Sequence, residues 1–116
     1  MKSLNKVTLI GHLGTDLEFK NLPNDLKVAQ VNMATSERFY DKNKVLQTNT
    51  DWHHLVFWGN LAEIANTYLK KGSFIYVEGK LKTRSYEDKE NIKKYVTEIQ
   101  VDNFILLDKK NEPSTV

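Results

Sequence analysis

The chain has 116 residues, 40% of them hydrophobic and 28% charged, which are ordinary values for one globular domain with a single core. No apolar run approaches the roughly 20 residues that cross a bilayer, and no signal-peptide core follows Met1. We therefore expect a cytoplasmic protein without a membrane partner. The absence of cysteine excludes disulfides and thiolate metal sites. A net charge of +2 is too small to indicate a basic protein, so evidence for a polyanionic partner must come from where the charges lie.

Two alternating segments open the chain. Apolar residues recur with a period of two over residues 6–13, where Gly11 stands at a position that suits the bend of a small barrel strand. Residues 21–25 have turn chemistry, and residues 27–36 alternate again, with one apolar and one polar side. The pattern predicts the first two strands of a sheet. Residues 39–50 are polar and predict a hairpin loop.

The third predicted strand carries both tryptophans. Trp52 and Trp58 are six residues apart, so the two-residue period of a strand places both indoles on one face. The opposite face takes His53, Leu55 and Phe57. Because this face already supplies an apolar row for the core, two large aromatics on the other side indicate a binding surface. The alternatives are a sandwich that buries both faces of the strand, or a subunit interface.

Residues 60–71 change to helical periodicity, with an apolar stripe made of Leu61, Ile64, Ala65, Tyr68 and Leu69. Asn60 and Glu63 predict a capping box at the start of this helix, and Gly72 predicts its end. A strand is then expected over residues 73–83, with Leu81 among its inward residues.

A second charged hairpin over residues 85–94 and a last strand over residues 95–107 complete the predicted elements. The order is three strands, one helix and two strands, with two long hairpins. It predicts a mainly β fold, a five-stranded OB barrel with one α-helix between strands 3 and 4. We expect this domain to span residues 1–108 and a short polar stub to span residues 109–116.

Aromatic residues beside cations extend the binding pattern into the hairpins. Phe39 and Tyr86 each stand near basic residues, and cations dominate residues 70–84. Aromatic platforms in a basic groove are how proteins hold single-stranded nucleic acid. A lysine-rich edge strand that prevents aggregation is the alternative interpretation of the charge run.

The sequence offers no motif for catalysis, for a metal site or for a cofactor. His53 and His54 are neighbours on a strand and therefore point to opposite faces, and His12 is distant in sequence. No glycine-rich phosphate loop and no hydrolase motif is present. We therefore expect a protein that is not an enzyme and that needs no cofactor and no metal. His53 shares its face with core residues, so we expect it to be buried, hydrogen-bonded or at an interface.

Short motifs in unbroken order over roughly residues 3–107 resemble the bacterial and mitochondrial single-stranded DNA-binding protein family. They are NKV at 5–7, GHLG at 11–14, ATSE at 34–37, TDWH at 50–53, WGNLAE at 58–63, YLKKG at 68–72 and VEGKL at 77–81. The resemblance implies an OB fold, a homotetramer, and sequence-tolerant binding and protection of single-stranded DNA during replication, recombination and repair. The cellular location that it implies is the nucleoid.

The resemblance also implies roles for individual residues. The base-stacking positions of the family fall on Phe39, Trp52, Trp58 and Tyr86, and two of these four are not tryptophan. Phosphate contacts are expected from the neighbouring cations, namely Lys6, Lys42, Lys44, Lys70, Lys71, Lys80, Lys82 and Arg84. We expect His53 and Tyr76 at the interface between subunits.

One departure concerns the C-terminal sequence. Family members usually carry a long linker that ends in an acidic tip and recruits replication and repair enzymes, whereas this sequence ends in KKNEPSTV. Tip-dependent partners are therefore not expected. Either the protein lacks this recruiting function, which we favour, or the chain is a shortened one. The first alternative is compatible with an accessory paralogue or a mobile-element version of the family. The alternative function is that of an OB-fold accessory subunit, whose aromatic face docks proteins and binds DNA weakly.

Overall fold

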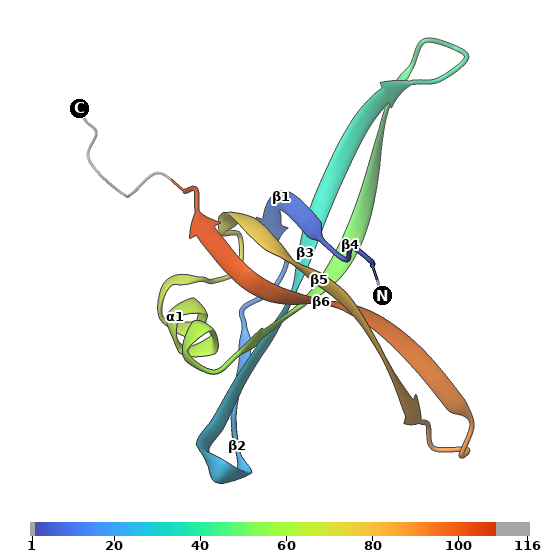
Figure 1. The fold of residues 1–116 in the computed structure, drawn as a ribbon. Helices are drawn as coiled ribbons and strands as arrows, with labels where there is room; N and C mark the ends of the chain where they lie inside the picture. Colours follow the sequence, from blue (N-terminus) through green and yellow to red (C-terminus); the bar gives the residue numbers. More distant parts are fainter. Residues whose placement is uncertain (1, 109–116) are drawn as a thin grey trace, which may run out of the picture.

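The alternating segments of the sequence form long strands that wrap into a barrel, with one helix packed against it (Figure 1). The computed structural model describes residues 2–108, so the predicted polar stub over residues 109–116 lies outside the described residues. The elements are β1 (Val7–Leu13), β2 (Glu18–Leu22), a short 3-10 turn (Pro23–Asp25), β3 (Leu26–Tyr40), β4 (Leu46–Trp58), α1 (Asn60–Tyr68), β5 (Phe74–Glu87) and β6 (Lys93–Leu106).

The barrel closes because β1 pairs with two strands. Most of β1 runs antiparallel to β5, and its last residues pair with β3, with His12 opposite Ala34. Five strands thus form a closed ring in the order β1-β5-β6-β4-β3. Gly11 lies at the change of partner, where a Cβ atom would stand 2.2 Å from the Ala34 carbonyl oxygen. The predicted OB barrel, with its helix between the third and fourth strands of the ring, is confirmed.

β2 is a strand that the sequence pattern did not predict. It pairs with β3 outside the closed ring and has no fully buried residue, so its sequence lacks the apolar alternation of a core strand. The predicted turn over residues 21–25 is correspondingly shorter, because Leu22 still belongs to β2. Asn24 and Asp25 make this turn with positive φ angles of 70° and 60°, a conformation that Asn and Asp tolerate better than most residues.

The core lies inside the barrel, as the face alternation of β4 predicts. Leu55 and Phe57 are fully buried, together with Ile75 and Val77 of β5. The Phe57 ring packs edge-on against Phe104 of β6, with 5.7 Å between the ring centroids. Leu81 was also predicted to point inward, and this is wrong. Its side chain is 48% exposed, because β5 has left the barrel by this point.

The helix α1 packs against β3 and β4 through Ala62 and Ala65, and Leu69 just after it is also buried. Two details of the predicted helix are wrong. Gly59, with φ of 63°, takes the N-cap position without a side-chain cap, so the Asn60 capping box does not form.

The helix also ends at Tyr68, before the predicted stop at Gly72, which instead adopts φ of 89° in the turn that leads to β5. The predicted stripe is partly wrong as well, since Ile64 and Tyr68 are exposed. The side of the helix that faces the barrel is the one with Ala62 and Ala65.

Two long two-stranded arms project from the barrel (Figure 1). They are the β3–β4 and β5–β6 hairpins, and their strands continue to short turns at residues 41–45 and 88–92. Most of the polar segment over 39–50 is therefore strand, where a loop was predicted, and the segment over 85–94 forms a hairpin as predicted. An arm with solvent on both faces needs no apolar alternation, so its sequence reads as a loop.

Each hairpin turn is held by an aspartate whose carboxylate accepts hydrogen bonds from backbone N–H groups of the same turn. The Asp41 carboxylate accepts hydrogen bonds from the backbone N–H groups of Asn43 and Val45 at 2.8 and 3.0 Å. Asp88 accepts equivalent bonds from residues 90 and 92. The Val45 N–H bond is the main cause that lowers the pKa of Asp41 below its usual value, with smaller contributions from Gln47 and Asn43. The ionised carboxylate therefore shapes each tip at neutral pH.

We predict that Phe57→Ala lowers the free energy of unfolding by about 3–5 kcal/mol, because it removes a buried ring and leaves a cavity. Trp58→Ala, at the next position but on the outer face, should change it by less than about 1 kcal/mol. Urea unfolding followed by circular dichroism at one protein concentration measures both. A stable Phe57→Ala beside an unfolded Trp58→Ala would contradict the assignment of the two faces of β4.

Candidate nucleic-acid interface

The outer face of β4 presents a row of side chains that ends in a tryptophan on each side. Trp52, His54, Val56 and Trp58 alternate with the core residues, and the row is about 20 Å long at the usual rise per residue. The Trp52 and Trp58 side chains are 61% and 41% exposed. Large flat aromatics left in solvent on a strand that already has a full core face are available for stacking.

Trp58 borders a groove between β4 and the base of the β5–β6 arm. Lys82 and Arg84 of β5 line it beside the indole, so an aromatic surface and two cations meet there. On its other side the groove opens into a hollow of about 350 Å³ that reaches Lys20 and Val28. This combination is suited to a base stacked on the indole with its phosphate beside the cations.

Trp52 lies at the other end of the row, against the backbone of Gly14. A Cβ atom at Gly14 would stand 2.4 Å from Cζ3 and 2.8 Å from Cη2 of the Trp52 ring. The absence of a side chain at position 14 therefore allows the indole to lie flat over the segment that follows β1. Sequence reasoning noted Gly14 only as part of a motif, because its contact with Trp52 is tertiary.

Phe39 and Tyr86 lie on the two arms. Phe39 is near the tip of the β3–β4 arm and Tyr86 near the tip of the β5–β6 arm, and their side chains are 50% and 46% exposed. The arms diverge in space (Figure 1), so these aromatics extend the surface in different directions from the barrel. Tyr40 and Tyr95 are exposed on the same arms, and the sequence argument did not consider them.

The eight predicted phosphate contacts are spread over several places. Only Lys82 and Arg84 line the groove beside Trp58. Lys80 precedes them on the same face of β5. The remaining cations are exposed at the tip of the β3–β4 arm, in the turn after α1, and just before β1; they are Lys42, Lys44, Lys70, Lys71 and Lys6. The backbone N–H of Lys71 donates to Asp16, which ties that turn to the segment before β2.

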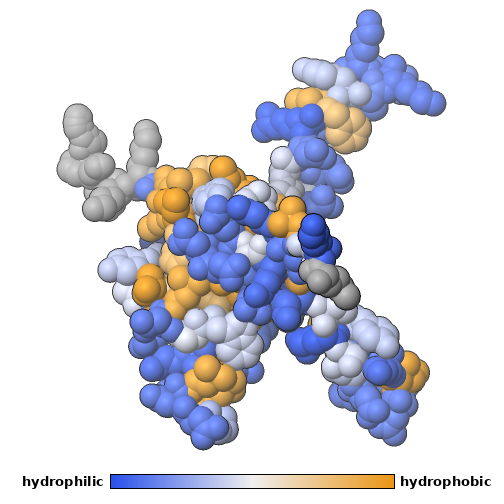
Figure 2. All heavy atoms as spheres, in the orientation of Figure 1, coloured by the Kyte–Doolittle hydropathy of each residue, from blue (hydrophilic) through white to orange (hydrophobic). Residues whose placement is uncertain are grey.

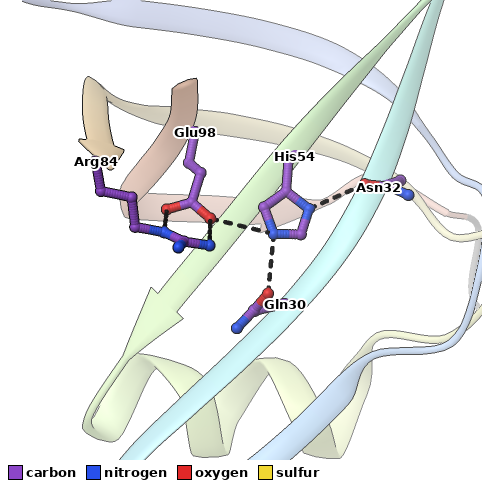
Figure 3. A network of polar contacts seen from close by, with 5 residues as sticks. All are labelled: Gln30, Asn32, His54, Arg84 and Glu98. Atoms are coloured by element: carbon purple, nitrogen blue, oxygen red, sulfur yellow. Dashed lines mark hydrogen bonds and ion pairs between the residues drawn. The ribbon is translucent and has the colours of Figure 1, made fainter. Parts of the chain in front are cut away.

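A polar network crosses the row between the two tryptophans (Figure 3). His54 Nδ1 lies 3.0 Å from Asn32 Oδ1, and His54 Nε2 lies 2.9 Å from Gln30 Oε1 and 3.5 Å from Glu98 Oε2. Arg84 donates two hydrogen bonds of 3.1 Å to the Glu98 carboxylate. Hydrogen bonding to Glu98 raises the pKa of Arg84, so this guanidinium is always charged.

Sequence reasoning did not assign four members of this network to the site. The signal for His54 was available, because it shares its face with Trp52 and Trp58. Gln30 and Asn32 were placed on the polar side of their strand. Glu98 had no signal, because its position depends on β6 lying beside β4. Its side chain is 10% exposed, the smallest value among the acidic groups that form ion pairs within residues 2–108.

The two residues predicted at a subunit interface lie away from this row. Nε2 of His53 is 2.8 Å from the Thr35 hydroxyl, and its side chain is partly buried. The Tyr76 hydroxyl donates to Glu78 at 2.6 Å, and this bond raises the pKa of Tyr76. In the barrel sheet, Tyr76 pairs with Ile10 on one side and Ile105 on the other, and both isoleucines are 52% exposed.

Within residues 2–108, no group of three or more histidines and carboxylates is placed to hold a metal ion. Within the same residues, no helix is long and apolar enough to span a membrane. The aromatic and polar row on β4, with the groove beside Trp58, is therefore the candidate site.

The closed barrel, the helix α1 packed against it and the two projecting arms define an OB-fold protein. Its outer β4 face is a candidate nucleic-acid-binding surface. The sequence model of the Single-strand binding protein family matches residues 4–107. The chain belongs to this family.

Two curated relatives are both called single-stranded DNA-binding protein 1. The protein of Chlorobaculum tepidum is 47% identical over 95% of this chain and 68% of its own length. The protein of Xylella fastidiosa is 44% identical over 100% of this chain and 86% of its own length.

Solved structures show the same fold. An SSB from Plasmodium falciparum in complex with ssDNA superposes with a TM-score of 0.85 at 38% identity, covering 93% of this chain and 98% of that one. A deletion mutant of the single-stranded DNA binding protein from Thermus aquaticus gives a TM-score of 0.79 at 27% identity, over 92% of this chain and 52% of that one.

We predict that Gly14→Ala displaces the Trp52 indole and leaves the fold intact. The added methyl group meets the far end of an exposed side chain, so the free energy of unfolding should change by less than about 1 kcal/mol. In a ¹H–¹⁵N spectrum, the Trp52 indole signal should shift while the Trp58 indole signal stays in place. Two unshifted indole signals would show that Gly14 does not position Trp52.

Proposed function

We propose that this protein binds single-stranded DNA without marked base preference. Bases stack on Trp52 and Trp58 of the barrel and on Phe39 and Tyr86 of the arms. Cations beside these rings contact the phosphates. Neither stacking nor phosphate contact reads the edges of bases, so the binding is tolerant of sequence.

One observation carries this proposal. Two tryptophans remain exposed on the outer face of a strand whose inner face is fully packed, and Lys82 and Arg84 line the groove beside Trp58. Packing of the protein core does not require exposed tryptophans beside cations. A flexible polyanion with flat bases is complementary to this arrangement. The names of the relatives and the ssDNA in the Plasmodium falciparum complex support the same ligand.

The biological role that fits such binding is protection of exposed strands during DNA replication, recombination and repair. The role requires no catalysis, and the protein would act at the nucleoid in the cytoplasm. Binding to the strand alone performs it, because bases stacked on the protein are not free to re-pair and phosphates in contact with its cations are shielded from nucleases.

A titration with oligothymidylate at several salt concentrations tests this function, with the quenching of tryptophan fluorescence as the measure of binding. Each neutralised phosphate contributes about −0.7 to the log–log salt slope on single strands, so several contacts should give a slope steeper than about −2. Trp52→Ala and Trp58→Ala should each cost about 1–3 kcal/mol of binding.

Ile64→Ala, on the exposed side of α1 and outside both the row and the arms, serves as the matched control and should bind like the wild type. Equal affinity for duplex DNA, or no binding to oligothymidylate, would contradict the proposed function. It would favour an accessory subunit that uses its aromatic face to dock proteins.

We also propose that the protein assembles as a homotetramer through the outer face of β1, β5 and β6. The row Ile10, Tyr76 and Ile105 crosses these strands with two half-exposed isoleucines. Thr35, the partner of His53, lines a neighbouring hollow with Ile10. In Figure 2, hydrophobic residues gather on the barrel body, while the arms are mostly hydrophilic. Exposed apolar surface of this kind marks an association face.

For this interface we predict that Ile10→Lys lowers the assembled mass, because the substitution places a charge in the apolar row. Ile92→Lys changes an isoleucine of equal exposure, 52%, at the tip of an arm and should leave the mass unchanged. Light scattering after size-exclusion chromatography measures both variants. Four chains in both would place the interface elsewhere, and a monomeric wild-type protein would contradict the tetramer.

A further inference from the structure

His54 occupies the centre of the candidate binding row, and stacking gives it no role. It lies between Trp52 and Trp58 on the outer face of β4, and its side chain is 31% exposed. A strand that stacks on both tryptophans must pass over it. The chemistry around this imidazole therefore bears directly on binding.

Oxygen atoms surround the His54 ring. Its two nitrogens face the side-chain oxygens of Asn32 and Gln30 on β3, and Nε2 also faces the Glu98 carboxylate on β6. A neutral imidazole has one N–H to donate, whereas the imidazolium has two and satisfies acceptors on both sides. Asp16 and Glu18 line the same hollow as His54 and add further negative charge. Both ring nitrogens thus have an oxygen within hydrogen-bond distance, and an imidazolium can donate to both.

Glu98 presents a charge conflict at this place. A nearly buried carboxylate repels the phosphates of a strand, and Arg84, which pairs with it through two hydrogen bonds, is the cation that balances it. With a neutral His54, these charges cancel. With an imidazolium, the side chains of Glu98, Arg84 and His54 together carry a charge of +1, before the nearby Asp16 is counted. Lys20, which lines the adjoining hollow, is itself 3.9 Å from the Glu18 carboxylate.

We propose that His54 is a DNA-binding residue that acts as an imidazolium, held by Glu98, and supplies the net positive charge at the centre of the row. This inference rests on the proposed binding of single-stranded DNA. Glu98 is a positioning residue in this arrangement, because it orients Arg84 and keeps a negative charge beside the ring. The neutral amides of Gln30 and Asn32 are the partners that a phosphate oxygen can replace.

Affinity then depends on pH, in a direction set by linkage. Phosphate favours the imidazolium over the neutral ring, so a bound strand favours proton uptake, and a bound proton favours the strand by the same factor. Binding is therefore tighter in acidic solution, where the ring carries its proton, and weaker in alkaline solution, where it does not. Thymine does not titrate in this range, so oligothymidylate isolates the contribution of the protein.

The experiment compares the wild-type protein with His54→Gln, which removes the charge, and His54→Lys, which keeps it at every pH. Binding of oligothymidylate is measured by the fluorescence anisotropy of a rhodamine label, because rhodamine emission does not change with pH in this range. The measurements are made at constant ionic strength, at about pH 5.5 and about pH 8.5, on either side of the imidazole range. Circular dichroism checks that each variant is folded. Calorimetry of the wild type in two buffers of different ionisation enthalpy measures proton uptake independently of any variant.

We expect the wild-type affinity to fall about fivefold to tenfold from the lower to the higher pH, the effect of one unit charge near a phosphate. It should match His54→Lys at the lower pH and His54→Gln at the higher, and the wild type should take up protons on binding. Wild-type binding that does not change with pH, or a pH dependence that persists in both variants, would overturn the proposed role of His54 and leave the proposed DNA binding standing. Absence of binding at either pH would overturn the proposed function together with it.

Discussion

The whole architecture depends on β1 changing partner from β5 to β3. This change closes the sheet, and it requires the backbone of β1 to approach Ala34 so closely that only glycine fits at position 11. Closure leaves no free edge on the ring and fixes which side of each strand faces the core. Because one side of β4 faces the core, the side that carries Trp52 and Trp58 faces outward. Binding surface and core are thus two consequences of one closure.

The arms follow a different physical rule. Beyond the barrel, each hairpin has solvent on both faces, so backbone pairing and an aspartate at each tip hold it without a core. Such arms can carry Phe39 and Tyr86 away from the barrel without any cost to its packing. The β3–β4 arm therefore lacks apolar alternation, and the sequence pattern predicts a loop there. A ligand that contacts both the barrel row and the arms must be long and flexible, as a single strand is.

The centre of the row combines opposite charges at close range. Glu98 is nearly buried beside a surface proposed to bind a polyanion. Its carboxylate pairs with the guanidinium of Arg84 and lies 3.5 Å from Nε2 of His54. A buried carboxylate is stable only with such partners. The same two hydrogen bonds that stabilise Glu98 also offset part of the positive charge that Arg84 presents to a phosphate in the groove.

The sequence by itself determined the succession of the five ring strands along the chain, the helix between the third and fourth of them, and the opposite faces of Leu55 and Trp58. Period-two and period-3.6 patterns carry this information locally. Only the tertiary structure decided that Gly14 supports Trp52, that β2 adds a sixth strand, and that Glu98 meets His54 and Arg84. These contacts join residues far apart in the chain, across strands whose neighbours are set by barrel closure, and no local pattern records which strands become neighbours.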